Sequence, residues 1–172
     1  WMRFIPGIVK GIGFVINVFV KEDEKVIIQP PVYHPFRLTP EGNHRKVVYN
    51  PLKENADGSY SMDFENLAEV ADEKCRVLIL SNPHNPAGIT WDADTLRRLA
   101  DFCSEHNIIV ISDEIHWLSS ATSICRLHRF RRRLHSAASR SALRLRRSTL
   151  RASLVRGASC RTRSCAVRCS SG

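Results

Sequence analysis

The sequence predicts an α/β fold built on a mostly parallel sheet, and two observations support this prediction. Runs dominated by apolar residues, without polar alternation, occur at 25–29, 76–80 and 108–112, as expected for strands buried on both faces. The last two runs are separated by a segment whose apolar residues have helical spacing. Strands joined by an amphipathic helix lie parallel, with helices covering both faces of their sheet.

Local signals in the sequence give each element its place. Pro30 and Pro31 end the first strand, and the Asp-Gly pair at 57–58 marks a turn. Asp63 is a suitable N-cap for the helix that comes after it. The predicted elements are, in chain order, a mostly buried helix at 7–20, a strand at 25–29, a helix or turn at 33–38, a strand at 46–49, a turn at 55–60, a helix at 64–72, a strand at 76–80, a second amphipathic helix, and a strand at 108–112.

The helix before the last strand has the clearest amphipathic pattern. Asp92 and Asp94 lie at its amino end, where negative charge is favourable. Its predicted buried face consists of Leu96, Leu99, Ala100 and Cys103. This face is expected to pack against the sheet.

The composition is that of a globular protein, but the charge is divided unevenly. The chain has 172 residues, 43% of them hydrophobic, which excludes collagen, coiled-coil and multi-span membrane proteins. Residues 1–116 contain 12 Lys and Arg against all 17 Asp and Glu, a net charge of −5. Residues 117–172 contain 14 Arg and no acidic residue, a net charge of +14. The overall net charge of +9 therefore describes neither part.

We interpret the chain as two segments, 1–116 and 117–172. The second is a basic, Arg/Ser-rich, low-complexity sequence, which predicts a disordered tail. Three interpretations compete: a tail that binds nucleic acid, a solvated tail without a partner, and translation in a shifted reading frame. The abrupt change near Trp117 favours the shifted frame. The four cysteines of this tail lack paired Cys-x-x-Cys spacing, so no metal site is predicted.

The amino-terminal apolar stretch at 4–20 is expected to be a helix packed inside the domain. Lys10 interrupts the stretch, no small-residue cleavage site comes after it, and it is short for a membrane span. Because the first residue is Trp, we expect further residues to precede it in the natural reading frame. With no anchor or export signal recognised, and with only Cys75 and Cys103 before residue 117, we expect a cytoplasmic location with buried, reduced thiols.

Polar residues lie directly after two neighbouring strands of the predicted sheet. The segment SNPHNPAG at 81–88 comes after one strand, and SDEIH at 112–116 ends the other. Ligands bind beyond the carboxyl ends of parallel strands, so these residues mark a candidate site. A buried Asp113 would be costly unless it faced a cation, a metal or a protonated ring nitrogen. A helix cap or an ordinary loop aspartate is the alternative.

These motifs resemble those of the class I/II aminotransferase-fold proteins that use pyridoxal phosphate, and more narrowly the MalY/PatB-type cystathionine β-lyase branch. The similarity runs over about residues 6–116 and includes IIQPPVYHPF, YNPL, SNPHNPAGITW and IIVISDEIH. It implies a partial large domain of the fold-type I pyridoxal-phosphate enzymes. For the intact family it also implies a homodimer and a small amino-acid substrate.

The resemblance implies a role for four side chains. Tyr33 would stack on the cofactor ring, and Asn85 would form a hydrogen bond with the phenolic oxygen of the ring. Asp113 would keep the pyridine nitrogen protonated, so that the ring withdraws electrons from the substrate α-carbon. His116 would lie near the phenolic oxygen, where many aminotransferases have a tyrosine.

The resemblance also implies a phosphate site at the turn that opens the first helix. This turn consists of Gly7, Ile8 and Val9, whose backbone N–H groups would face the phosphate. Each assignment has an ordinary alternative. The alternatives are a packing role for Tyr33, a turn role for Asn82 and Asn85, a loop position for His84, a solvated or capping role for Glu114, and solvated surface positions for His34, His44 and His106.

The lysine that binds the cofactor covalently in this family has no counterpart in the chain. All six lysines precede Asp113, whereas the family has its lysine after this position. The chain as written is therefore expected to attach no cofactor covalently and to be inactive in the family reaction. That reaction is β-elimination from a thio-amino acid, giving a thiol, pyruvate and ammonia, and the alternative is amino-group transfer. A non-enzymatic protein that binds nucleic acid through the Arg-rich tail is an alternative of another class.

Overall fold

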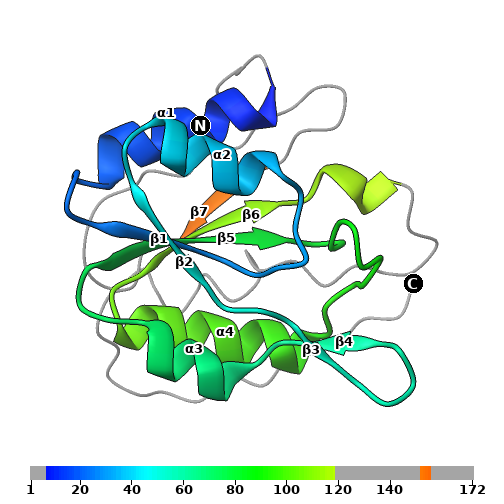
Figure 1. Ribbon diagram of the computed structural model, residues 1–172. Coiled ribbons are helices and arrows are strands. Elements are labelled where there is room, and N and C mark those ends of the chain that lie inside the picture. Colours follow the sequence, from blue (N-terminus) through cyan, green and yellow to red (C-terminus); the bar gives the residue numbers. More distant parts are fainter. Residues whose placement is uncertain (1–6, 119–151, 156–172) are drawn as a thin grey trace, which may run out of the picture.

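A sheet lies between two layers of helices in the computed structural model, which describes residues 7–118 and 152–155 (Figure 1). The elements are α1 (Ile8–Phe19), β1 (Lys25–Ile28), α2 (Pro35–Gly42), β2 (Lys46–Tyr49), β3 (Lys53–Glu54), β4 (Tyr60–Ser61), α3 (Phe64–Val70), β5 (Cys75–Ser81), α4 (Ala93–Glu105), β6 (Ile109–Asp113), the 3-10 helix η1 (Ile115–Leu118) and β7 (Ala152–Val155). The sheet order is β2-β1-β5-β6-β7, and all neighbours are parallel except β6 and β7. The predicted α/β class is confirmed.

Capping residues explain where two of the helices begin. The Asp63 carboxylate accepts a hydrogen bond from the backbone N–H of Asn66 at 2.9 Å, as predicted for the N-cap of α3. Asp92 accepts from the backbone N–H of Thr95 at 2.7 Å at the start of α4. The buried residues of α4 are those of the predicted face: Leu96, Leu99, Ala100 and Cys103.

Three features differ from the sequence expectation or extend it. The helix or turn expected at 33–38 is the longer α2, whose carboxyl end is held by a 2.7 Å hydrogen bond from Asn17 of α1 to Asn43. The predicted turn at 55–60 connects β3 and β4, which form a separate antiparallel hairpin. Residues 152–155 pair with β6, although disorder was expected there, and the rest of the predicted tail beyond residue 118 lies outside the described residues.

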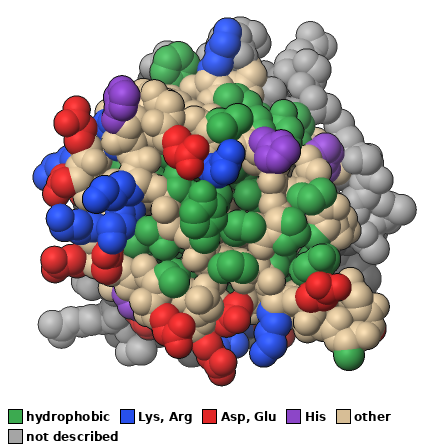
Figure 2. Space-filling model, in the orientation of Figure 1, with side chains coloured by type: hydrophobic (Ala, Val, Ile, Leu, Met, Phe, Trp, Pro, Cys, Tyr) green, Lys and Arg blue, Asp and Glu red, His purple; other side chains and the backbone are tan. Residues whose placement is uncertain are grey.

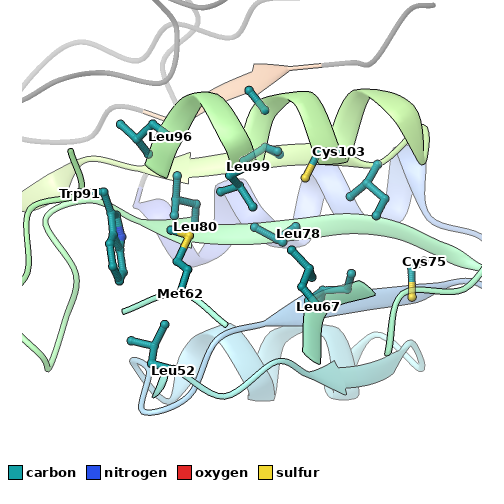
Figure 3. Close-up of a cluster of buried hydrophobic side chains, with 14 residues drawn as sticks. Leu52, Met62, Leu67, Cys75, Leu78, Leu80, Trp91, Leu96, Leu99 and Cys103 are labelled. Atoms are coloured by element: carbon teal, nitrogen blue, oxygen red, sulfur yellow. The ribbon is translucent and has the colours of Figure 1, made fainter. Parts of the chain in front are cut away.

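The core is divided between the two faces of the sheet, because successive strand residues point to opposite sides. One cluster packs under α1 and α2 and includes Ile12, Ile16, Phe36, Val77, Ile79, Ile109 and Ile111. The other packs under α3 and α4 and includes Leu67, Leu78, Leu80, Leu96, Leu99, Cys103 and Val110 (Figure 3). Burying a side chain of this size contributes roughly 1.5–3 kcal/mol, so the two clusters fix both helix layers on the sheet.

The two cysteines of the described residues are free and buried, as predicted. Both belong to the cluster under α3 and α4. Burial raises the pKa of the Cys103 thiol to about 12 and also raises the pKa of Cys75. Neither thiol therefore ionises near neutral pH.

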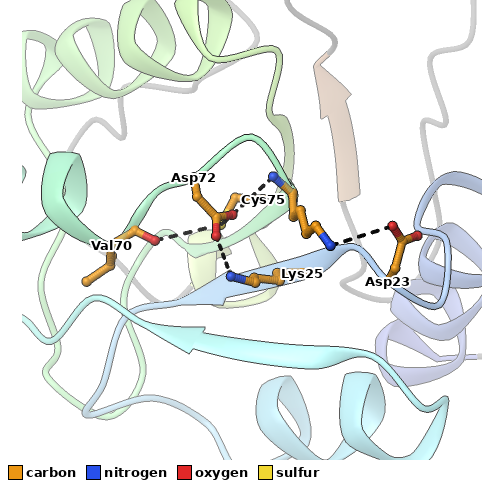
Figure 4. A network of polar contacts seen from close by, with 6 residues as sticks. Asp23, Lys25, Val70, Asp72 and Cys75 are labelled. Carbon is orange, nitrogen blue, oxygen red and sulfur yellow. Dashed lines mark hydrogen bonds and ion pairs between the residues drawn. The ribbon is translucent and has the colours of Figure 1, made fainter.

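Charged residues form ion pairs at the amino ends of β1 and β5 (Figure 4). Lys25 forms an ion pair with Asp72, and Lys74 lies 4.0 Å from Asp23. The Cys75 thiol lies 3.4 Å from the Asp72 carboxylate. These pairs are partly exposed and contribute little to stability individually. They lie at the amino ends of the parallel strands, whereas the candidate site residues come after the carboxyl ends.

None of the helices in the described part of the chain combines the length and the apolar character that a membrane span requires.

Candidate functional site

The strand order reverses direction between β1 and β5. From β1 the chain continues to β2 on one side, whereas from β5 it continues to β6 on the other side. In open α/β sheets such a reversal, at the carboxyl ends of the strands, is where ligands bind. The segments after β1 and β5 contain Tyr33 and Asn85, both of which are predicted site residues.

A backbone hydrogen bond joins these two segments. The N–H of Tyr33 donates to the carbonyl of Asn85 at 3.1 Å. The Tyr33 side chain is 43% exposed, and its ring meets Phe36 edge-on at 6.0 Å between centroids. The N–H of Asn85 donates to the Ser81 hydroxyl at 3.2 Å, which fixes the loop to the end of β5. The structure thus brings Tyr33 and Asn85 together at one sheet edge.

Asp113 ends β6 at the same edge and is 5% exposed. The backbone carbonyl of Asp113 accepts from the N–H of Asn82 at 2.8 Å, which ties β6 to the loop after β5. Burial raises the pKa of the Asp113 carboxyl to about 7. Two smaller effects act on the same pKa: the hydrogen bond from the Ile115 N–H lowers it, and the negative charge of Glu114 raises it. A carboxyl with this pKa would ionise readily beside a cationic group.

The next residue, Glu114, is buried, so the solvated surface position considered for it is wrong. Its side chain is 1% exposed, and its carboxylate accepts from the Ser112 hydroxyl at 3.4 Å. The backbone turns into η1 directly after β6, which keeps this side chain inside. His116 is the second residue of η1, and its side chain is exposed.

The amino end of α1 lies at the same end of the sheet as the carboxyl ends of the strands (Figure 1). Gly7 is its N-cap, with a φ of 102° that favours glycine, and it provides no side-chain cap. The first turn contains no acidic residue, and its N–H groups have no acceptors within the helix. Ile8 and Val9, which begin α1, therefore present backbone donors and the positive end of the helix dipole.

Three further buried polar side chains were given no role at the site from the sequence. Gln29 and Asn50 come directly after β1 and β2, and His84 lies in the loop after β5; they are 1%, 0% and 3% exposed. Gln29, Asn50 and Asn82 each precede a proline at the end of a strand. This repeated pattern is the feature of the sequence from which buried amides at the site could have been predicted. His34, His44 and His106 are exposed, as expected.

No group of His, Cys, Asp and Glu able to hold a metal ion occurs among residues 7–118 and 152–155.

The chain matches the family described as Aminotransferase class I and II over residues 3–120. It belongs to this family. Cystathionine beta-lyase PatB from Bacillus subtilis is 42% identical over 116 residues, which are 67% of this chain and 30% of PatB. Protein MalY from Escherichia coli is 35% identical over 111 residues, which are 64% of this chain and 28% of MalY.

Solved structures give the same picture of this aminotransferase-family chain. The PLP-bound C-S lyase from Staphylococcus hominis is 34% identical, with a TM-score of 0.67 over 72% of this chain and 32% of that one. The chain thus spans less than a third of the length of these relatives. The predicted resemblance to the class I/II aminotransferase fold and its cystathionine β-lyase branch is confirmed over the part that matches.

Proposed function

We propose that residues 7–116 are the cofactor-binding part of a pyridoxal-phosphate-dependent carbon–sulfur β-lyase. The observation that supports this most directly is the buried carboxyl of Asp113 at the sheet edge that also holds Tyr33 and Asn85. The names of two relatives, a cystathionine beta-lyase and a PLP-bound C-S lyase, support the type of reaction. The proposed substrate is an amino acid with a sulfur leaving group, which would give a thiol, pyruvate and ammonia.

The residues at this edge fit pyridoxal phosphate in their chemistry. Burial raises the pKa of Asp113, and a protonated ring nitrogen beside the carboxylate would favour its ionised form. The half-exposed ring of Tyr33 would support one face of the cofactor, and Asn85 and His116 would lie near its phenolic oxygen. The N–H groups that begin α1, from Gly7 onward, would bind the phosphate.

When bound, pyridoxal phosphate supplies a ring that withdraws electrons from the α-carbon of an amino acid. The part of Asp113 is to hold a proton on the ring nitrogen, and its burial keeps water from competing for that proton. The part of Asn85 is to orient the ring. None of these groups is assigned the transfer of the α-proton, which the resemblance gives to the lysine of the family. We therefore propose that residues 1–116 bind the cofactor without a covalent bond and do not complete the reaction.

The boundary near residue 116 is part of the proposal. Residues 1–116 would form the unit that belongs to the family, and residues 117–172 would result from a shifted reading frame. Sequencing the encoding DNA across this boundary tests the idea directly. A second frame that continues from SDEIH with acidic residues and a lysine would support it, and its absence would refute it.

Amino-group transfer is the second candidate, favoured by the family description itself. Both reactions need the same groups around the ring, and they differ in the step after loss of the α-proton. The restored, full-length protein would decide between them. Release of pyruvate and a thiol from cystathionine supports the lyase, whereas transfer of the amino group to an oxo acid supports the aminotransferase.

The binding proposal is tested with pyridoxamine 5′-phosphate, which has the same ring and phosphate but cannot form an imine with surface lysines. Titration of the purified chain by calorimetry should show one saturable site. Asp113→Asn should weaken binding by roughly tenfold or more, because a hydrogen bond between charged groups is lost. Asp101→Asn, on the exposed side of α4, is the matched control and should bind like the parent. Equal affinity for all three proteins would refute the role of Asp113.

We further propose that the intact protein is a homodimer. Figure 2 shows hydrophobic side chains gathered in the middle of one face, with charged side chains mostly at its left and lower margins. Apolar surface bordered by charge is typical of protein interfaces. Sedimentation equilibrium of the full-length protein tests this, and a monomer at all concentrations would refute it.

The buried, free thiols of Cys75 and Cys103 favour a reducing, cytoplasmic location. A nucleic-acid partner is not proposed, because the basic residues 117–172 are assigned to a shifted reading frame and residues 1–116 have a net charge of −5.

A further inference from the structure

Two buried polar side chains behind the candidate site have atoms without a hydrogen-bond partner. His84 is 3% exposed, and neither of its ring nitrogens has a partner. Gln29 is 1% exposed, and its side-chain oxygen has none. Buried polar groups in proteins are almost always hydrogen-bonded, because leaving one unpaired is costly. Each of these two side chains therefore needs a structural explanation.

Each residue lies in a segment that contains a proposed cofactor contact. Gln29 begins the segment that leads from β1 to Tyr33, and His84 directly precedes Asn85. The backbone carbonyl of Gln29 lies near the His84 ring and favours its protonated form, although the two do not meet the geometry of a hydrogen bond. Desolvation has the larger effect and lowers the pKa of His84, so the ring is neutral at neutral pH and has one N–H donor and one acceptor.

The surrounding contacts hold the His84 ring in place. The backbone N–H of His84 donates to the carbonyl of Ile89 at 2.6 Å, and its carbonyl accepts from Gly88 at 2.8 Å. The ring meets Trp91 edge-on, with 5.8 Å between centroids. The indole N–H of Trp91 donates to the carbonyl of Ser81 at 2.9 Å. These contacts fix the backbone of the loop at His84 and pack Trp91 against its ring.

The Gln29 amide is fixed from the other side. Its NH₂ group donates to the Asn50 side-chain oxygen at 3.0 Å. Asn50 in turn donates to the carbonyl of Asp63 at 2.9 Å and to the Asn66 side chain at 3.0 Å. With its NH₂ group engaged by Asn50, the remaining polar atom of Gln29 is an acceptor, which is the complement of a neutral imidazole N–H.

We propose that His84 is a positioning residue that couples the Tyr33 segment to the Asn85 loop through one internal water, which would bridge the His84 ring and the Gln29 side-chain oxygen. The backbone hydrogen bond from the Tyr33 N–H to the Asn85 carbonyl joins the same two segments. His84 contacts neither the cofactor nor the substrate and acts through Asn85 and Tyr33. Its effect on cofactor affinity rests on the proposed function, whereas its effect on the coupling of the two segments does not.

Hydrogen exchange of the Tyr33 amide measures the coupling without any ligand. His84→Phe should speed this exchange by about tenfold, the loss expected for one net hydrogen bond, while exchange of the Val110 amide in the central strand β6 stays unchanged. His84→Gln, which retains a donor and an acceptor, should restore part of the protection. His106→Phe, a substitution of an exposed histidine, is the matched control. Unchanged Tyr33 exchange in His84→Phe would overturn the proposal.

A double-mutant cycle with Gln29→Leu distinguishes a shared role from two separate packing roles. If the side chains act together, the effects of His84→Phe and Gln29→Leu on Tyr33 exchange are less than additive. Additive effects would overturn the proposal. If His84→Phe does not fold, the nitrogen chemical shifts of the parent ring decide: one neutral tautomer with a protected N–H is expected, and a freely exchanging ring would overturn it.

The affinity for pyridoxamine 5′-phosphate separates this inference from the proposed function. His84→Phe should weaken binding by about tenfold, and His84→Gln by less. No binding by the parent chain would refute the proposed function and leave the exchange result standing. Binding that is equal in parent and His84→Phe would refute the effect of His84 on the site.

Discussion

Replacing Asp113 with asparagine isolates the energetic cost of the buried carboxylate. Burial raises the pKa of this carboxyl from its ordinary value of 3.8 to about 7. An asparagine has nearly the same shape, and its side-chain oxygen can still accept from the Ile115 N–H, which lies 3.0 Å from the Asp113 carboxylate. The substitution therefore removes the ionisation and little else.

The sign of the effect is set by proton linkage. Because the folded state holds the Asp113 proton more tightly than the unfolded chain does, this group's contribution to stability is complete below pH 3.8 and is lost as the pH rises through about 7. The full loss is about 4 kcal/mol, because each pKa unit corresponds to about 1.4 kcal/mol. Between about pH 5 and about pH 8 the loss is roughly 2–3 kcal/mol.

Urea unfolding near pH 5 and near pH 8 measures this difference. From pH 5 to pH 8, the free energy of unfolding of the parent should fall relative to that of Asp113→Asn by roughly 2–3 kcal/mol. Asp101→Asn, at an exposed position, is the control, and its free energy of unfolding should match that of the parent at both pH values. If Asp113→Asn and the parent lose stability equally, burial does not determine the ionisation of Asp113, and the carboxylate needs no cationic partner.

Three further substitutions test other parts of the structure. Gly7→Ala should cost roughly 1–3 kcal/mol, because φ at this position is 102°, and it should also weaken pyridoxamine 5′-phosphate binding, which calorimetry would detect. Asp92→Ala removes the N-cap of α4 and should lower the free energy of unfolding by about 1 kcal/mol in urea, with Asp101→Ala as the control for the lost charge. Leu99→Ala, at a fully buried position of the same helix, should cost roughly 2–5 kcal/mol and lower the thermal midpoint; a change as small as that of a surface substitution would contradict the described core.

The sequence alone could predict the elements whose signals are local. The face of α4 with Leu96 and Leu99 and the cap at Asp63 depend on residues close together in the chain, and both are confirmed. Asp92 lies at the amino end of α4, as predicted from its charge, and the structure adds that it is the N-cap. The burial of Glu114 was not foreseen, because it depends on how the backbone turns into η1 after β6. Local pattern contains no such information.

The polar residues behind the site were missed for a related reason. Gln29, Asn50 and His84 come from three separate strand ends, and only the sheet order places β1 between β2 and β5. A buried amide in a loop has the same local sequence as a solvated one, so its partners decide its role. The roles of Tyr33, Asn85, Asp113 and His116 remain predictions that binding experiments test.

The buried sulfur atoms of Cys75 and Cys103 have a consequence for a chain proposed to belong to a thiol-releasing enzyme. Thiol–disulfide exchange needs a thiolate and an approaching partner, and burial withholds both at these two positions. Mixed disulfides with a released product are therefore disfavoured while the domain is closed. The same protection makes the two residues internal reporters: alkylation by iodoacetamide, monitored peptide by peptide in a mass spectrometer, would record how often the layer beneath α3 and α4 opens.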